Sequence, residues 1–328
     1  MPMTPRLGFV GLGWIGRDRL RHAVTAGAAT PAAYLEPDPA NLAAANALAP
    51  APAAQDLDDL LDRELDGVVI ASPNHLHPEQ ARAVAERGLP VFCQKPLAHR
   101  RQDAERVISA AEGSNVLLAV DWSYRGTQAL NALRQALHQG AIGDCYHAEL
   151  AFHNAYGPDK AWYRDPQKAG GGCLLDLGCH LVDALQWLLP QEDFRVVRAH
   201  LYQGGRRLQP NAIEDHAIVA LQGQGTTAQV QSSWNVPSGG QADIRIHLFG
   251  TKGGLRFTNL GGSFYDFRAE HLTGTTSRSL CEPPDAWGGR QLVSWAHDLR
   301  DGRRVFRKDA WQVADNARLL EETYACAS

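Results

Sequence analysis

The sequence predicts an α/β protein with two domains, a doubly wound parallel sheet followed by a mostly antiparallel one. Up to about residue 121, short apolar runs alternate with segments of helical periodicity, which is typical of a parallel sheet with crossover helices. Beyond residue 123, apolar and polar residues alternate between glycine-containing turns, which is typical of antiparallel strands. We therefore expect one domain over residues 1–122 and a second over 123–328, whose final helices can pack back on the first.

The composition is that of a globular protein without an affinity for nucleic acid. Of the 328 residues, 44% are hydrophobic and 21% are charged, and the net charge of −4 is carried without a basic cluster. No apolar stretch approaches the ~20 residues of a membrane span. The first strand begins too early for a signal peptide, and the six cysteines are dispersed. These features predict a cytoplasmic protein with reduced cysteines.

A glycine motif in the first strand–helix unit predicts a dinucleotide site. The apolar run Leu7–Val10 ends in Gly11-x-Gly13-x-x-Gly16, and a helical segment follows. The glycines allow a tight turn, close approach of the backbone to a diphosphate, and close packing of helix on strand. Free N–H groups at the helix start then favour the anion. A second apolar run, Ala32–Leu35, closes the βαβ unit.

Glu36 at the end of this second strand favours NAD over NADP. It stands 20 residues beyond Gly16, where a carboxylate can accept hydrogen bonds from a ribose and would repel a 2′-phosphate. Arg17 could weaken this preference by attracting a phosphate. Trp14 and Ile15, inside the glycine motif, are also expected at the cofactor.

The remaining elements of the first domain follow in order. We expect helices over 56–61, 78–87 and 102–111, and strands over 67–71, 91–93 and 116–120. In such a sheet, ligands collect at the carboxyl ends of the strands. The residues there that we expect at the cofactor are Ser72, Pro73, Asn74, His77, Gln94 and Lys95.

The second domain is expected to begin with a helix over 128–139 and to continue as an antiparallel sheet. Alternating runs occur over 144–152, 197–201 and 244–248, and two helices over 290–299 and 310–324 close the chain. A sheet of this kind packs on one face and leaves the other open. We expect a homodimer or homotetramer formed through that open face.

The second informative stretch is Gly170–Asp183. Asp176 and His180 are four residues apart in a helical pattern and project from one face, with Asp183 nearby. Histidine suits proton transfer near neutral pH, and a carboxylate can fix its tautomer. Such a pair is also common on helix surfaces, but the three preceding glycines indicate that something approaches the backbone closely. The pair is therefore a candidate catalytic group.

Together these motifs resemble the glucose–fructose oxidoreductase, inositol dehydrogenase and rhizopine-catabolism (Gfo/Idh/MocA) family of NAD(P)-dependent oxidoreductases. The resemblance rests on the glycine motif, Gln94-Lys95-Pro96 and Gly170–His180, and extends over nearly the whole chain. It implies that Lys95, Asp176 and His180 are catalytic. The chain departs from the family at Gln94, where Glu is usual, which removes a negative charge beside Lys95.

The resemblance implies hydride transfer between the nicotinamide of NAD and a carbinol carbon of a sugar, cyclitol or related polyol. His180 would remove the hydroxyl proton with Asp176 orienting it, and Lys95 would hydrogen-bond the developing alkoxide. The opposite assignment, with Lys95 as the base, is also open. Residues that flank the motif in sequence are candidates for substrate contact: Tyr124, Arg125, His153, Asn154, Tyr156, Trp162, Tyr163 and Arg164.

Two further functions fit the same resemblance. One is NAD-dependent glycoside hydrolysis through transient oxidation at C3, in which NAD is regenerated. The other is a non-catalytic NAD(P)-binding regulator, which would have no need of Lys95 and His180. No metal is expected, because the spacing of Cys173, Cys179 and their neighbours does not match a zinc site.

Overall fold

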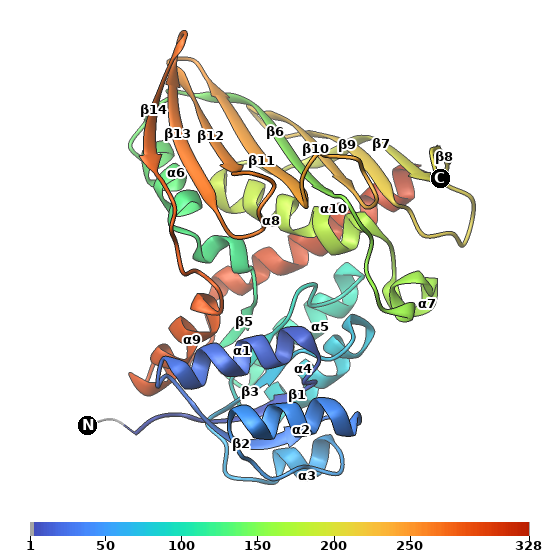
Figure 1. Ribbon diagram of the computed structural model, residues 1–328, viewed down its shortest axis with the longest axis vertical. Coiled ribbons are helices and arrows are strands. Elements are labelled where there is room, and N and C mark those ends of the chain that lie inside the picture. Colours follow the sequence, from blue (N-terminus) through green and yellow to red (C-terminus); the bar gives the residue numbers. More distant parts are fainter. Residues whose placement is uncertain (1–2, 328) are drawn as a thin grey trace. The chain divides into compact units, whose positions relative to one another are not determined.

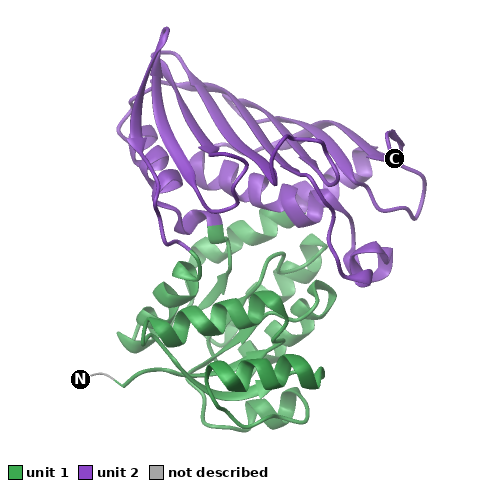
Figure 2. Cartoon of the chain, in the orientation of Figure 1, with its two compact units in different colours: residues 1–123, 288–317 green, residues 124–287, 318–328 purple. Residues whose placement is uncertain are grey.

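The computed structural model describes residues 3–327, which form two compact units (Figure 2). Unit 1 comprises Met1–Ser123 and Gly288–Ala317, and unit 2 comprises Tyr124–Trp287 and Arg318–Ser328. Each unit has its own sheet, parallel in unit 1 and mostly antiparallel in unit 2 (Figure 1). The α/β fold with two sheets that the sequence predicts is confirmed.

The sheet of unit 1 has five parallel strands in the order β2-β1-β3-β4-β5. They are β1 (Arg6–Val10), β2 (Thr30–Leu35), β3 (Gly67–Ile70), β4 (Val91–Cys93) and β5 (Leu118–Val120). Every residue of β3 is buried, as expected for a strand covered on both faces. The strand order reverses beside β1, and ligands of doubly wound sheets bind at the carboxyl ends of the strands flanking this reversal.

The helices of unit 1 include one that comes from far along the chain. They are α1 (Trp14–Thr25), α2 (Pro39–Leu48), α3 (Leu57–Leu61), α4 (His77–Glu86), α5 (Arg101–Gly113) and α9 (Arg290–Arg300), with short 3₁₀ turns η1 (Asn74–Leu76) and η5 (Lys308–Trp311). In α9, the ring centroid of Trp295 lies 5.6 Å from that of Phe92 in β4. A Cβ on Gly67 would lie 2.8 Å from Trp295, so close packing of this helix requires glycine at the start of β3.

Unit 2 is built on a sheet of nine strands. Their order is β14-β13-β12-β11-β6-β10-β9-β7-β8, and only β6 and β10 pair in parallel. The strands are β6 (Cys145–Asn154), β7 (Arg195–Gln203), β8 (Arg206–Arg207), β9 (His216–Gln222), β10 (Thr227–Ser233), β11 (Ala242–Gly250), β12 (Gly253–Asn259), β13 (Phe267–Thr273) and β14 (Thr276–Cys281).

Helices cover one face of this sheet (Figure 1). They include α6 (Gln128–His138) and α8 (Cys179–Leu188), and the remaining helical segments are η2 (Ser123–Gly126), η3 (Ala161–Arg164), α7 (Pro166–Ala169), η4 (Leu174–Gly178) and α10 (Gln312–Ala327). In β6, Leu150 and Phe152 are buried toward the helices, and Glu149 projects from the opposite face, here called the open face. No helix within residues 3–327 is long and apolar enough to cross a membrane.

Candidate functional site

The glycine turn of unit 1 joins β1 to α1 and leaves no room for side chains. Gly11 has a φ of +81°, and a Cβ built on it would lie 2.5 Å from the backbone nitrogen of Ser72. A Cβ on Gly16 would lie 2.1 Å from the carbonyl oxygen of Gly11. Gly11 is therefore required for the loop after β1 to pack against the loop after β3, and Gly16 is required for α1 to pack against the glycine turn.

The start of α1 fits an anionic ligand. Gly13 is the N-cap residue, and no side chain caps the first N–H groups of the helix. Trp14 is 63% exposed and Ile15 is half-buried at this helix start. A glycine turn followed by an uncapped helix fits the diphosphate of a dinucleotide.

Glu36 is held beside the glycine turn by backbone groups. Its Oε2 accepts a hydrogen bond from the N–H of Leu12 at 2.5 Å, and its Oε1 accepts one from the N–H of Asp38 at 2.9 Å. The Arg17 guanidinium donates to the carbonyl oxygen of Leu12 at 2.7 Å and to Oδ1 of Asn41. The carboxylate is thus preset next to the turn, while Arg17 is engaged with neutral acceptors.

The loop after β3 is braced from inside. His77 is 1% exposed, and its Nδ1 and Nε2 each lie 2.8 Å from a backbone carbonyl oxygen, those of Pro96 and Ser72. Burial lowers the pKa of the His77 imidazole. The sequence predicts a cofactor contact for His77, but its ring is enclosed and both nitrogens face the backbone. Pro73 is half-buried and Asn74 is buried in the same loop.

Gln94 and Lys95 follow β4 directly. Gln94 is 7% exposed, and its Nε2 donates a hydrogen bond to Oδ2 of Asp121, which follows β5. Lys95 is half-buried. A glutamate at position 94 would bring a second carboxylate next to that of Asp121, and the two would repel each other. The neutral amide of Gln94 avoids this repulsion.

In unit 2, Asp176 and His180 are the only residues between positions 171 and 186 that are not buried. The sequence predicts one regular helix here, whereas η4 is a π-helical turn that runs into α8. A π turn contains slightly more residues than an α turn, so residues four apart still lie on one side. Single π turns inside helices are frequent at functional sites.

Asp176 is held by a series of aromatic side chains that come from other elements. The Nε1 of Trp234, one residue after β10, donates a hydrogen bond to Oδ2 of Asp176 at 3.1 Å. The Tyr163 ring packs edge-on against Trp234, with centroids 6.3 Å apart, and Trp162 stacks on Tyr163 at 3.8 Å. Trp162, a candidate for substrate contact, is therefore linked to Asp176 through ring contacts.

His180 lies among aromatic rings as well. The ring of Tyr124 packs edge-on against it, with centroids 5.0 Å apart, and the ring of Phe152 in β6 lies 6.3 Å away. Tyr124 also packs against Trp287 at 5.5 Å. The structure thus brings Tyr124, from the candidate substrate set, directly to the imidazole.

The start of the π turn is held by Glu214, which the sequence does not single out. Its Oε1 accepts hydrogen bonds from the N–H groups of Gly172 at 2.8 Å and Leu174 at 3.0 Å, and from the Tyr324 hydroxyl at 2.8 Å. Burial raises the pKa of the Glu214 carboxyl, and burial together with Glu214 raises that of Tyr324.

The same two residues explain the triple glycine. A Cβ on Gly171 would lie 2.0 Å from the Tyr324 hydroxyl oxygen, and one on Gly172 would lie 1.9 Å from the carbonyl oxygen of Glu214. The close approach that the sequence predicts is therefore real, but the chain itself makes it. Gly171 and Gly172 provide the room for a clamp on the helix start.

Other residues of the candidate substrate set lie elsewhere in unit 2. Arg125 pairs with buried Asp183, through Nε to Oδ2 at 2.8 Å and Nη2 to Oδ1 at 2.5 Å. His153 bonds Ser233 Oγ at 2.6 Å on the open face, because it follows Phe152 and neighbouring strand residues point to opposite faces. Tyr156 is 52% exposed and Arg164 is exposed.

These placements bear on two of the expected substrate contacts, Arg125 and His153, which stay predictions. Arg125 is engaged by a carboxylate inside unit 2, and His153 lies on the other face of the sheet from the ring of Phe152 that contacts His180. Both residues flank the Asp176–His180 motif in sequence, but sequence proximity does not determine which face of a strand a side chain occupies.

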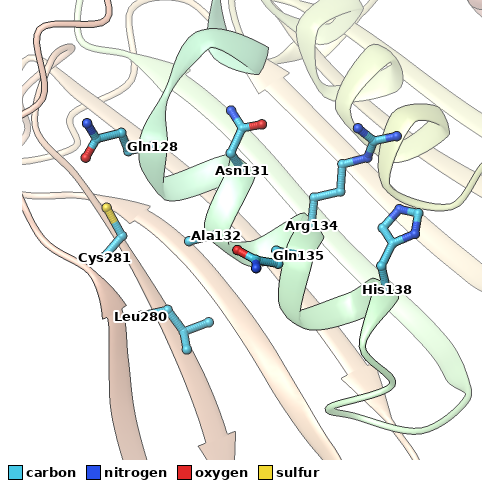
Figure 3. A pocket seen from close by; sticks show the side chains of 8 residues that line it. All are labelled: Gln128, Asn131, Ala132, Arg134, Gln135, His138, Leu280 and Cys281. Atoms are coloured by element: carbon cyan, nitrogen blue, oxygen red, sulfur yellow. The ribbon is translucent and has the colours of Figure 1, made fainter.

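Unit 2 also has a shallow cavity of about 650 Å³ between α6 and β14. Figure 3 shows Arg134 and His138 on the helix side and Leu280 and Cys281 on the strand side. None of the predicted site residues lines it. Within residues 3–327, no three His, Cys, Asp or Glu side chains gather into a set that could hold a metal ion.

The fold and these residues define a class of protein: a dinucleotide-binding domain joined to a sheet domain that carries a candidate proton-transfer pair. Residues 5–122 match the family model described as an oxidoreductase family with an NAD-binding Rossmann fold. Residues 130–256 match the model of the GFO/IDH/MocA C-terminal domain. The chain belongs to the Gfo/Idh/MocA oxidoreductase family, and unit 1 contains its NAD-binding domain.

Two curated relatives and one solved structure illustrate the similarity. The rhizopine catabolism protein MocA of Rhizobium meliloti is 29% identical over 254 residues, which cover 76% of each chain. The 1,5-anhydro-D-fructose reductase of Ensifer adhaerens is 30% identical over 197 residues, covering 59% of this chain and 57% of that protein. This chain thus spans just over half of some curated relatives.

The solved structure is levoglucosan dehydrogenase in complex with NADH and levoglucosan. It superposes with a TM-score of 0.82 at 22% identity, covering 99% of this chain and 98% of that one. At this identity the similarity establishes the fold.

Proposed function

We propose that this chain catalyses hydride transfer between NAD and a carbinol carbon of a sugar, cyclitol or related polyol. The observation that carries the proposal is the Asp176–His180 pair, which alone is accessible in a buried, clamped helix start. It occurs in a chain with an NAD-binding domain. The relatives described above are named for rhizopine, 1,5-anhydro-D-fructose and levoglucosan, which supports the substrate class.

The proposed mechanism assigns one task to each residue. Bound NAD supplies the acceptor for the hydride that leaves the carbinol carbon. His180 takes the proton of the hydroxyl group as the O–H bond breaks and a C=O bond forms. Asp176, itself held by Trp234, positions the imidazole and stabilises its cation. Lys95 donates a hydrogen bond to the oxygen as negative charge develops there.

The aromatic neighbours of the pair support a polyhydroxylated substrate. Tyr124 lies against His180, and Trp162 is linked through Tyr163 and Trp234 to Asp176. Aromatic rings combined with a few polar groups are typical of small-molecule sites. We propose Tyr124 and Trp162 as substrate contacts.

A substrate panel tests the proposed function. The purified protein is incubated with NAD and a set of inositols, free sugars, anhydrosugars and linear polyols, and NADH is followed by absorbance. We expect NADH to accumulate with at least one member. Release of sugar from an aryl glycoside without net NADH would instead indicate hydrolysis through transient oxidation, and NAD binding without turnover of either set would indicate a regulator.

We further propose that the chain forms a homodimer or homotetramer through the open face of its large sheet. Aromatic and imidazole rings contact one another there, within β7 and β11 and between β7 and β9. The cytoplasmic location expected from the sequence stays a prediction.

A further inference from the structure

Gln94 lies against a buried ion pair inside unit 1. Arg19 of α1 donates from Nε to Oδ2 of Asp121 at 2.5 Å, and their side chains are 6% and 1% exposed. The same oxygen accepts the hydrogen bond from Nε2 of Gln94. The backbone N–H of Asp121 donates to the carbonyl oxygen of Cys93 at 2.8 Å. The network therefore joins α1 to the chain segments that follow β4 and β5.

Asp121 determines which way the Gln94 amide points. An ionised carboxylate only accepts hydrogen bonds, so it must meet the NH₂ group of the amide. The amide oxygen Oε1 is then directed away from Asp121. A glutamate at position 94 could not donate to Asp121, and two adjacent carboxylates disfavour each other's ionisation. Asp121 thus selects glutamine at position 94.

The network contains two features that do not favour the folded state. Oδ1 of Asp121 is buried and has no hydrogen-bond partner within residues 3–327. Unsatisfied buried polar atoms are rare and destabilising. Buried ion pairs themselves contribute little net stability, since desolvation offsets their attraction. Neither feature by itself stabilises the core, and both lie beside the Gln94–Lys95 segment.

We propose that Asp121 and Arg19 are positioning residues of the cofactor site. They orient the Gln94 amide so that Oε1 accepts a hydrogen bond from the bound dinucleotide, and they hold the segment that carries Lys95. The family usually has a negative charge at position 94; in this chain Asp121 carries that charge instead, and Arg19 neutralises it. The activity part of this inference rests on the proposed function, whereas the binding part requires only the NAD-binding domain.

The test moves the carboxylate between the two positions. Gln94→Glu, Asp121→Asn and the double variant Gln94→Glu/Asp121→Asn are compared with the wild-type protein. NADH affinity is measured by fluorescence, and kcat is measured with the best substrate of the panel. Folding is checked by circular dichroism and by Tm. We expect each single variant to bind NADH at least ~10-fold more weakly, because one places two carboxylates together and the other removes the more buried of the two carboxylates that pair with Arg19.

The double variant is the informative one. It restores one carboxylate and one amide in exchanged positions, so we expect NADH affinity within about threefold of wild type. Its new carboxylate beside Lys95 also raises the pKa of the lysine ammonium, so a limb of the kcat–pH profile that reports Lys95 shifts to higher pH. A merely structural pair would not weaken NADH binding in folded Gln94→Glu and restore it in the double variant at an unchanged Tm.

Asp18→Asn is the matched control. Asp18 also pairs with Arg19, from Nη1 to Oδ2 at 2.6 Å, but its side chain is 17% exposed and its other partners, Arg21 and His22, lie on α1 itself. Removing this carboxylate perturbs Arg19 without touching the amide. We expect NADH affinity within twofold of wild type.

The outcomes separate this inference from the proposed function. It is overturned if folded Gln94→Glu binds NADH as tightly as wild type, or if the double variant binds no better than Gln94→Glu. That comparison decides the question even if Asp121→Asn alone does not fold. If the wild-type protein oxidises no member of the panel but the NADH affinities follow the expected order, the positioning role stands and the proposed function fails.

Discussion

At the scale of single residues, Lys95 tests the proposed mechanism most directly. Lysine accounts for only five of the 32 basic residues, so a lysine after a buried strand indicates chemistry that arginine cannot perform. Lys95→Ala should lower kcat by about 10²–10³-fold, the usual effect of losing one donor to a developing oxyanion. Lys95→Arg should lower kcat nearly as much, because the planar guanidinium of arginine cannot replace the compact ammonium of lysine. NADH affinity serves as the control, and near-full activity of Lys95→Arg would contradict the mechanism.

Glu36 governs the choice of cofactor. Its carboxylate is preset by the N–H groups of Leu12 and Asp38, which leaves lone pairs for ribose hydroxyls and negative charge against a 2′-phosphate. We expect the wild-type protein to prefer NAD and Glu36→Ser to shift the preference toward NADP. Dissociation constants for NADH and NADPH measure this. Equal affinities of the wild-type protein for NADH and NADPH would refute this prediction. Glu64→Ser, which removes a carboxylate outside the glycine turn, is the control.

Single residues also show how far sequence reasoning extends. Gly11, Gly16 and Glu36 are recognisable because their roles are local to one βαβ unit. Asp121 lies 102 positions from Arg19, and Tyr324 lies 110 positions from Glu214. Contacts at such separations leave no pattern in a single sequence. The surroundings of His77 and His153 are not predictable for a related reason, since the pattern does not show which side chains a loop or strand encloses.

At the scale of elements, periodicity is the information that the sequence provides. The strands of unit 2 are predictable because buried and exposed residues alternate, as in β9, where Ala217, Val219 and Leu221 are buried. Helix α2 is not, because its alanine-rich sequence lacks a distinct apolar face. The π turn η4 is not predictable either, because a single turn is too short to distinguish its period from that of an α-helix.

The clamp on η4 gives a prediction at this scale. Tyr324→Phe removes the hydroxyl that donates to Glu214, while the ring remains beside Gly171. We expect a loss of about 1–2 kcal/mol in the free energy of unfolding. We also expect a lower kcat with unchanged NADH affinity, since Glu214 holds the start of the turn that carries Asp176 and His180.

Thr323→Val is the matched control for this variant. Thr323 is the adjacent buried residue, and its hydroxyl donates within α10 to the carbonyl oxygen of Leu319 at 2.7 Å. Its loss should affect stability slightly and kcat not at all. Unchanged kcat in Tyr324→Phe would show that the clamp is dispensable for the geometry of the pair.

For the whole molecule, His99 predicts sensitivity to acid. Burial lowers the pKa of His99 to about 4, and Nε2 is buried without a hydrogen-bond partner within residues 3–327. The unfolded chain takes up the proton near pH 6.5, so the contribution of His99 to stability is complete above that pH and is lost as the pH falls toward 4. At about pH 5 the free energy of unfolding is therefore lower by ~2 kcal/mol than it is above pH 6.5.

Urea unfolding at about pH 7.5 and about pH 5 measures this effect. His99→Gln cannot take up a proton, so it should lose less stability between the two pH values than the wild-type protein by about this amount. An equal loss in both proteins would show that His99 is not responsible.

The open face of unit 2 has the composition of an interface. The rings of His200, Tyr202 and His216 lie together on this face, with centroids 6.4 Å and 6.0 Å apart, and are partly exposed, whereas the neighbouring Ser233 and His153 are buried. A second cluster joins His247 and Phe249 at 3.8 Å. No lysine lies in the nine strands. Protein interfaces are enriched in aromatic residues and depleted of lysine, which fits a second copy of the chain on this face.

Ile218 of β9 lies on this face, opposite His200 and Gln231 on the neighbouring strands. We expect light scattering at micromolar concentration to give the mass of a dimer or tetramer, and Ile218→Lys to shift it toward the monomer, because a buried interface would have to desolvate an unpaired charge. Val305→Lys makes a similar change at a residue of unit 1 that is 55% exposed, and it should leave the mass unchanged. A monomeric wild-type protein would rule out assembly through the open face, and an oligomer that both variants leave intact would place the interface elsewhere on the chain.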